Sequence, residues 1–179
     1  MKAVLIFVSS LDGKVTKWDD PNVKIWTSHQ DQEYYRQIWN ECRLIVMGSN
    51  TYNVDPHPAS PNHLKVVMTS HPEKYKSNYA PGQLEFTSES PKELFSRFEK
   101  EGRKDVLVIG GPHVATSFLK DALIDELWLT IEPKIFGAGS NFAIEEKLDI
   151  SLELLSFEKV NKQGTLITKY AVVKQKGVR

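Results

Sequence analysis

Apolar residues along the chain form short uninterrupted runs that are separated by segments of helical spacing. The continuous runs occupy residues 3–8, 44–47, 64–68, 106–109 and 124–131. A strand that is buried on both faces reads as a continuous apolar run rather than an alternating one. These segments are therefore predicted to be central strands of a sheet, and residues 84–86 add a further short strand.

Three intervening segments carry apolar residues at helical spacing. The first follows Thr27 and Ser28, either of which would cap a helix that runs to about Cys42. The second begins at Ser90 and runs to about residue 100, and the third covers residues 112–123. Proline stands in the first turn of the last two helices, where its missing N–H would have no partner in any case.

The end of the chain changes from continuous to alternating patterning. Residues 151–159 and 165–174 flank a polar turn at residues 161–164, which predicts an antiparallel hairpin. Together with strands that alternate with helices, this predicts an α/β fold with a mixed, mostly parallel sheet and helices on both faces. At 179 residues we expect one domain, residues 1–179.

Composition narrows the classes of partner. The chain has 23 Lys and Arg against 23 Asp and Glu, a balance that does not favour nucleic acid. The single Cys cannot form an internal disulfide, and no Cys/His spacing is typical of a metal site. The first apolar run is too short for a signal peptide or a membrane span. We expect a soluble cytoplasmic protein with a small-molecule substrate and no metal, membrane or nucleic-acid partner.

Glycine and hydroxyl residues follow three of the predicted parallel strands. The junctions are Gly48-Ser49-Asn50-Thr51, Thr69-Ser70-His71 and Gly110-Gly111. Each alone is equally typical of a tight turn, and the last lacks the G-x-G-x-x-G spacing of dinucleotide-binding folds. In open α/β sheets, however, ligands bind beyond the carboxyl ends of the strands, where helix N-termini attract anions. Three such ends together favour a ligand with several phosphates, such as a dinucleotide.

Six short motifs follow one another in an order that is familiar from one superfamily. They are SLDGK at residues 10–14, IWTS at 25–28, MGSNTY at 47–52, VIGG at 108–111, DELWLT at 125–130 and PKIFGAG at 133–139. Through them nearly the whole chain resembles the dihydrofolate reductase superfamily. It is most similar to stand-alone proteins that are like the reductase domain of bacterial riboflavin biosynthesis. The resemblance implies a three-layer αβα sandwich and NADPH as the cofactor.

The resemblance also implies a cofactor site. The residues that would face the pyrophosphate and nicotinamide side are Gly110, Gly111, Pro112, His113, Val114 and Ala115. Those that would lie against the other phosphates are Gly48, Ser49, Asn50 and Thr51. Those that would receive the adenosine ribose and its 2′-phosphate are Thr69, Ser70 and His71, and Val8 would offer its backbone to the carboxamide. Ser49 stands where dihydrofolate reductases carry a basic residue, so NADH remains an alternative unless His71 or Lys74 supplies the charge.

On the substrate side, the resemblance implies contacts from Asp12, Trp26, Asp31 and Thr130. Asp31 follows Trp26 by five residues, as does the carboxylate that holds the pterin in dihydrofolate reductases. Hydride transfer to a C=N bond builds negative charge on nitrogen, and a nearby acid with a raised pKa supplies the proton. A carboxylate in the first turn of a helix also stabilises the helix dipole without any substrate. Both interpretations of Asp31 stay open.

Two departures from the family patterns leave the substrate open. Riboflavin reductases carry Asp-Asp-Pro and then an Arg that grips the ribose phosphate, whereas here Asp55 and Pro56 remain and no Arg follows shortly. The Arg that pairs with the glutamate tail of dihydrofolate is not evident either, and Lys65 would be a poor bidentate substitute. The zinc motif of the deaminase half of the bifunctional enzyme is absent.

The leading prediction is an NADPH-dependent reductase of a small heterocyclic substrate, either pterin-like or ribosylaminopyrimidine-like. One alternative is the 5-amino-6-(5-phosphoribosylamino)uracil reductase of riboflavin biosynthesis, and another is a non-catalytic nucleotide-binding member. The apolar run at residues 124–130 and the final hairpin favour a homodimer, as riboflavin-type reductases tend to form. An edge strand that is covered within one chain would show the same pattern.

Overall fold

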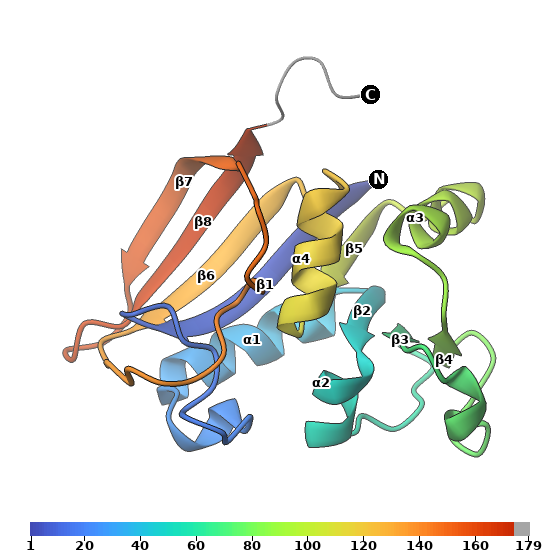
Figure 1. Ribbon diagram of the computed structural model, residues 1–179, viewed down its shortest axis with the longest axis horizontal. Coiled ribbons are helices and arrows are strands. Elements are labelled where there is room, and N and C mark those ends of the chain that lie inside the picture. Colours follow the sequence, from blue (N-terminus) through green and yellow to red (C-terminus); the bar gives the residue numbers. More distant parts are fainter. Residues whose placement is uncertain (174–179) are drawn as a thin grey trace.

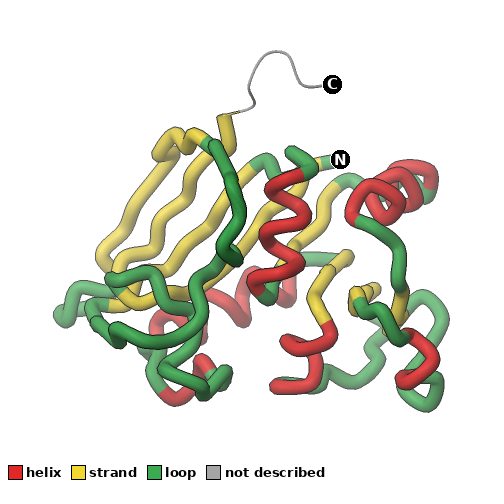
Figure 2. The backbone as a smooth tube through the Cα atoms, in the orientation of Figure 1, coloured by secondary structure: helices red, strands yellow, loops and turns green. Residues whose placement is uncertain are grey.

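The computed structural model describes residues 1–173 and is built around an eight-stranded sheet with helices on both faces (Figure 1, Figure 2). The strands are β1 (Lys2–Ser10), β2 (Leu44–Gly48), β3 (Leu64–Met68), β4 (Leu84–Thr87), β5 (Asp105–Val108), β6 (Glu126–Glu132), β7 (Ser151–Lys159) and β8 (Leu166–Val173). Their order in the sheet is β4-β3-β2-β5-β1-β6-β8-β7. The first six run parallel, and β8 and β7 form the antiparallel end. The predicted mixed α/β fold is confirmed.

Helices cover the two faces of this sheet and make the predicted three layers. On one face, α1 (His29–Glu41) and α2 (Ser49–Val54) pack Ile38 and Tyr52 against the strands. On the other face, α3 (Pro91–Lys100) and α4 (Pro112–Lys120) bury Phe98 and Phe118 completely. The continuous apolar strands thus have a hydrophobic core on each side.

The ends of the helices differ in how they are capped. Ser28, rather than Thr27, caps α1 because its Oγ accepts the N–H of Asp31 at 3.3 Å. Ser90 and Glu93 cap α3 reciprocally. By contrast, α2 and α4 begin at Gly48 and Gly111, and no side chain in the described part of the chain caps either start. The first-turn N–H groups of both helices therefore remain available for a ligand.

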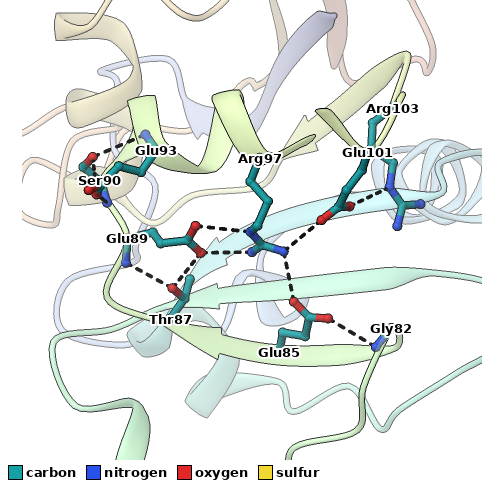
Figure 3. A network of polar contacts seen from close by, with 9 residues as sticks. All are labelled: Gly82, Glu85, Thr87, Glu89, Ser90, Glu93, Arg97, Glu101 and Arg103. Atoms are coloured by element: carbon teal, nitrogen blue, oxygen red, sulfur yellow. Dashed lines mark hydrogen bonds and ion pairs between the residues drawn. The ribbon is translucent and has the colours of Figure 1, made fainter. Parts of the chain in front are cut away.

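A polar network fixes α3 beside the edge of the sheet (Figure 3). The Arg97 guanidinium donates to both Glu89 oxygens at 3.2 and 3.1 Å, to Glu85 on β4 at 3.2 Å and to Glu101 at 3.5 Å. These ion pairs are partly buried at the surface, where such pairs contribute about 0–1 kcal/mol each. The network therefore serves mainly to orient α3, whose stability comes from its buried apolar face.

The structure also refines the predicted boundaries. The junction after β2 is the helix α2, which was missed because six residues are too few to show a helical period. The third predicted helix ends at Lys120, and β6 begins at Glu126 rather than at Ile124. Between them Asp125 turns the chain, since its carboxylate accepts the N–H of Ala3 at 2.8 Å. Two short 3₁₀ helices, Val23–Ile25 and Pro72–Tyr75, lie in predicted loops. Lys174, the last residue of the predicted final strand, lies outside the described residues.

Candidate functional site

A cavity of about 1060 Å³ lies beyond the carboxyl ends of the central strands. Its wall is made by the end of β1, by α1, by the starts of α2 and α4, and by the loops at residues 15–24 and 139–145. Ligand pockets are commonly about 300–1,000 Å³, so this volume suits a large ligand or two ligands side by side. The position of the cavity agrees with the rule that ligands of open α/β sheets bind beyond the carboxyl ends of the strands.

Asp31 is a buried acid on this wall. Its side chain is only 6% exposed, in the first turn of α1, and it exchanges hydrogen bonds with the hydroxyls of Thr130 and Thr27. Burial raises the pKa of Asp31 to about 6, helped by the negative charge of Glu132 and opposed by the two hydroxyls. A carboxyl with such a pKa is still protonated in a fraction of the molecules near neutral pH, as a proton donor must be.

Thr130 and Trp26 lie behind Asp31 rather than on the cavity wall. Thr130 is 2% exposed and contacts Asp31, so it reaches the cavity only through that carboxyl. Trp26 is 5% exposed and packs edge-to-face on Phe136, with ring centroids 5.1 Å apart. Its indole N–H has no hydrogen-bond partner among residues 1–173. Thr130 supports the acid through this contact, and direct contact of either side chain with a substrate stays a prediction.

Asp12 joins two loops outside the cavity wall. Its carboxylate accepts hydrogen bonds from Ser10 Oγ at 2.6 Å and from the N–H groups of Gly137 and Phe136 at 2.8 and 3.2 Å. The Ser10 hydroxyl and these backbone groups lower the pKa of Asp12 to about 2. The carboxylate thus holds the two loops together, and its contact with a substrate stays a prediction.

Two glycine junctions meet at the opposite end of the cavity. The N–H of Gly48 donates to the carbonyl of Gly110 at 2.8 Å, which brings the starts of α2 and α4 side by side. A Cβ on Gly111 would lie 3.2 Å from Thr51 Oγ1, and a Cβ on Gly48 would lie 3.1 Å from Val114 Cγ2. Gly110 has φ +94 and is joined to Gly111 by a cis peptide bond. Gly110 is the position that requires glycine, since a Cβ there would lie 2.7 Å from Phe7 Cζ.

The predicted cofactor residues therefore fall into three groups. The residues on the cavity wall are Val8, Asn50, Thr51, Gly111, Pro112 and His113. Those in the same two junctions but behind the wall are Gly48, Ser49, Gly110, Val114 and Ala115. Those at the neighbouring strand end, outside the cavity, are Thr69, Ser70 and His71. The His71 ring lies 3.2 Å from a carboxylate oxygen of Glu73, and the His71 N–H donates to Thr69 Oγ1 at 3.2 Å.

Sequence reasoning missed an aromatic and charged wall at the substrate end. Tyr35, Arg36 and Trp39 of α1 face the cavity, and the ring of Trp39 lies 4.2 Å from that of His57. They follow Asp31 and Gln32 at helical spacings of three, four and seven, which is the signal that would have found them. The loop residues opposite, such as Asp55 and His57, carry no such signal.

One positive charge on this wall is without a partner. The ammonium of Lys24 lies 2.6 Å from Asp55, whereas the guanidinium of Arg36 has no hydrogen-bond or ion-pair partner among residues 1–173. Lys65 lies elsewhere: it is 2% exposed and donates to the carbonyl of Pro58. Arg36 is thus the residue on the wall best placed to bind an anionic group of a ligand.

Residues 1–173 provide neither a metal centre nor a membrane-spanning helix. No group of three or more His, Cys, Asp and Glu side chains there is arranged to hold a metal ion. In the same range, no helix combines the length and the apolar character that crossing a membrane requires.

Comparison with known proteins gives consistent results. The sequence profile of the family described as the RibD C-terminal domain matches residues 2–166. The uncharacterized protein YwjB of Bacillus subtilis is 26% identical over 148 residues, which cover 77% of this chain and 80% of YwjB.

Two solved structures show the same fold. One is the diaminohydroxyphosphoribosylaminopyrimidine deaminase/5-amino-6-(5-phosphoribosylamino)uracil reductase of Thermotoga maritima, with a TM-score of 0.76 and 16% identity. The match covers 96% of this chain and 56% of the Thermotoga protein, so the chain spans little more than half of that protein. The other is a pyrimidine reductase-like protein of Corynebacterium diphtheriae, with a TM-score of 0.77 and 16% identity over 97% of this chain and 92% of that one.

Proposed function

Because the chain belongs to the family of the RibD C-terminal domain, we propose that it is a reductase that uses NADPH to reduce a small heterocyclic substrate. One observation carries the proposal: a buried acid, Asp31, and an open glycine junction at Gly111 lie on the wall of the same cavity. The acid suits proton donation to a substrate, and the junction suits an anionic cofactor.

The cofactor end of the cavity offers backbone N–H groups rather than charged side chains. The starts of α2 and α4 would hold the pyrophosphate through their free N–H groups, with Thr51 and His113 beside it on the wall. NADPH, when bound, supplies the hydride. Val8, at the end of β1, would present its backbone to the nicotinamide carboxamide. The close approach of Gly111 to Thr51 is what leaves room for the phosphates.

The substrate end supplies a proton and excludes water. Asp31 in its protonated form holds the proton on a carboxyl oxygen, and the Thr130 and Thr27 hydroxyls orient that group. Because the carboxyl is almost completely buried and lies on the cavity wall, its proton is offered to a substrate in the cavity. After the proton moves to a nitrogen of the substrate, Asp31 is left as a carboxylate that regains a proton from solvent.

The substrate is expected to be flat and negatively charged. Tyr35 and Trp39 give the wall an aromatic surface, and Arg36 offers a free guanidinium to a phosphate or carboxylate. A ribosylaminopyrimidine phosphate has both features, and the Thermotoga maritima protein is described as a reductase of such a compound. Dihydrofolate has both features too, and it is the second candidate because of the spacing of Trp26 and Asp31.

A binding titration followed by a reductase assay tests the proposal. We expect NADPH to bind the purified protein, and NADH to bind more weakly. We then expect loss of the reduced-nicotinamide absorbance with 5-amino-6-(5-phosphoribosylamino)uracil and little with dihydrofolate. Reduction of dihydrofolate alone would favour the second candidate. Absence of NADPH binding would leave the non-catalytic alternative.

We further infer that the protein is a homodimer that pairs through β7. This strand forms the edge of the sheet. Its side chains Leu152, Leu154 and Phe157 have exposed fractions of 42, 50 and 69%. The irregularity between Leu154 and Ser156 in the strand register keeps all three on one face of the sheet. An exposed apolar face on an unpaired strand edge is typical of a surface that pairs with another chain.

Leu154→Glu is therefore expected to convert the protein from dimer to monomer. The substitution places a charge in the centre of the proposed apolar interface, where it would be desolvated. Ser156→Glu is the matched control, because it adds the same charge to the opposite face of the same strand. Sedimentation velocity measures both variants. A monomeric wild type, or a dimer that Leu154→Glu leaves intact, would contradict the inference.

A further inference from the structure

A second buried carboxylate, Glu132, lies close to Asp31 and was not part of any predicted site. Glu132 is the last residue of β6 and is 2% exposed. One of its oxygens accepts the backbone N–H of Ser28 at 2.7 Å, and the other accepts the hydroxyl of Thr165 at 2.7 Å. Both partners donate, which suits an ionised carboxylate because that form only accepts hydrogen bonds.

The two carboxyl groups lie along the same contact between β6 and α1. Thr130 and Glu132 are two residues apart on a strand, so their side chains point to the same face. Thr130 contacts Asp31, and Glu132 binds Ser28, whose Oγ in turn accepts the N–H of Asp31 at 3.3 Å. The start of α1 is thus attached to β6 at two adjacent points, and each point carries one carboxyl group.

We propose that Glu132 is a positioning residue that acts through Asp31: it fixes the start of α1 and its negative charge holds the proton on the Asp31 carboxyl. The proposal rests on the proposed role of Asp31 as the acid. A like charge nearby in a buried setting disfavours ionisation of the second group. Glu132 itself does not line the cavity, so it reaches the substrate only through Asp31.

The other charged and titratable groups around Asp31 do not supply the negative charge that disfavours its ionisation. Tyr34 and Tyr35 lie on α1 itself, and burial, together with the charge of Asp31 among other effects, raises the pKa of both phenols, so they stay neutral. On β8, the Lys169 ammonium lies 4.0 Å from the centre of the Trp128 ring and 6.0 Å from that of Tyr34. From β6, the charge that acts on Asp31 is Glu132.

The contact to Thr165 links the pair to the turn between β7 and β8. Thr165 is completely buried, and its hydroxyl also accepts a hydrogen bond from the Asn161 amide at 2.8 Å. The Asn161 side chain in turn closes the turn by accepting the N–H groups of Gly164 and Thr165, each at 3.0 Å. Glu132 therefore fixes α1 to the hairpin as well as to its own strand.

Two variants separate the charge of Glu132 from its structural contacts. Glu132→Gln keeps an oxygen for the Ser28 N–H and removes the charge. Thr165→Val keeps the charge and removes two hydrogen bonds, the one to Glu132 and the one from Asn161. The readout is a carbon-13 titration of the Asp31 carboxyl in the protein without ligand, assigned with Asp31→Asn, together with thermal unfolding.

Glu132→Gln is expected to lower the measured pKa of Asp31 by about 0.5 to 1. Thr165→Val is expected to lower the melting temperature and leave that pKa in place. In the wild type, the Glu132 carboxyl resonance should move as Asp31 ionises, a measurement that stands even if Glu132→Gln does not fold. Two results would show that Glu132 is only a structural contact. One is an unchanged Asp31 pKa in Glu132→Gln, and the other is a Glu132 resonance that does not move over the pH range in which Asp31 ionises.

These titrations need neither cofactor nor substrate, so they are independent of the proposed reductase activity. If the NADPH assay fails but the Asp31 titration gives the expected result, the proposed reductase activity is refuted and the charge coupling between Glu132 and Asp31 stands. With an active enzyme, Glu132→Gln should also shift the upper pH limit of turnover downward with that of Asp31.

Discussion

Asp31→Asn is expected to lower turnover by about 100- to 10,000-fold, the range over which general acids contribute to catalysis. The amide keeps the size of the side chain and its contact with Thr130 but has no proton to donate. NADPH binding should stay within about twofold of wild type, because the cofactor end of the cavity is unchanged. Turnover of the wild type should fall as pH rises above about 6, the pKa of Asp31, and this dependence should disappear in the variant.

The same substitution is expected to stabilise the protein at neutral pH. The pKa of Asp31 in the folded state is raised, from 3.8 to about 6. Its stabilising contribution is therefore complete below pH 3.8 and is lost as pH rises to about 6. The loss corresponds to about 3 kcal/mol at pH 7–8. Asn has no such ionisation, so Asp31→Asn should unfold at a higher denaturant concentration than the wild type at pH 8, and at a similar one near pH 4.

Glu33→Gln is the matched control, since Glu33 is an exposed carboxylate two residues further along α1 that pairs with His29 at 3.2 Å. It should change neither turnover nor its pH dependence. A variant Asp31→Asn that is active, or that loses stability at pH 8, would refute the acid role. Gain of stability with loss of activity is typical of a group kept in an unfavourable state for function.

Gly111→Ala is expected to weaken NADPH binding at least tenfold, equivalent to about 1.4 kcal/mol, with little change in melting temperature. The backbone of Gly111, at φ −73 and ψ −163, is open to alanine. The new methyl would lie 3.2 Å from Thr51 Oγ1, on the part of the wall where the phosphates are proposed to bind. The substitution should therefore affect the affinity for NADPH more than the melting temperature. A fluorescence titration with NADPH and a thermal melt measure the two effects.

The double variant Gly111→Ala with Thr51→Ala distinguishes two causes of a loss. It removes the Oγ1 that the new methyl would crowd, so any local shift is relieved. If the methyl itself occupies cofactor space, binding stays weak in the double variant. Recovery of wild-type affinity would assign the loss to displacement of Thr51, and full affinity in Gly111→Ala alone would refute the proposed phosphate site.

Much of this architecture was readable in the sequence. The five apolar runs became parallel strands, and in β1, β2 and β5 burial on both faces leaves little polar alternation. The glycine junctions were also found, since a tight turn between strand and helix needs glycine. The match to the RibD C-terminal domain confirms the resemblance inferred from six short motifs.

What the sequence did not disclose depends on contacts between distant segments. Glu132 reads as an ordinary polar residue at the end of a strand, and its burial follows only once α1 and the hairpin close over it. Asp12 has the same residue type as Asp31, yet the loop at Gly137 occupies its carboxylate. Arg36 does not stand out in the sequence, because it lies on α1 and not in the loop after Asp55, where the resemblance places an arginine.

The position of β1 in the sheet has a consequence for synthesis. β1 is synthesised before both of its partners, β5 and β6, so Lys2 cannot pair with Asp105, nor Val8 with Thr130, until those later strands have been made. Until then an apolar strand with two open edges is present in the nascent chain. Pairing over such sequence distances folds slowly and leaves intermediates prone to aggregation. The strand at the centre of the folded protein is thus the one that most needs a chaperone while the chain is being made.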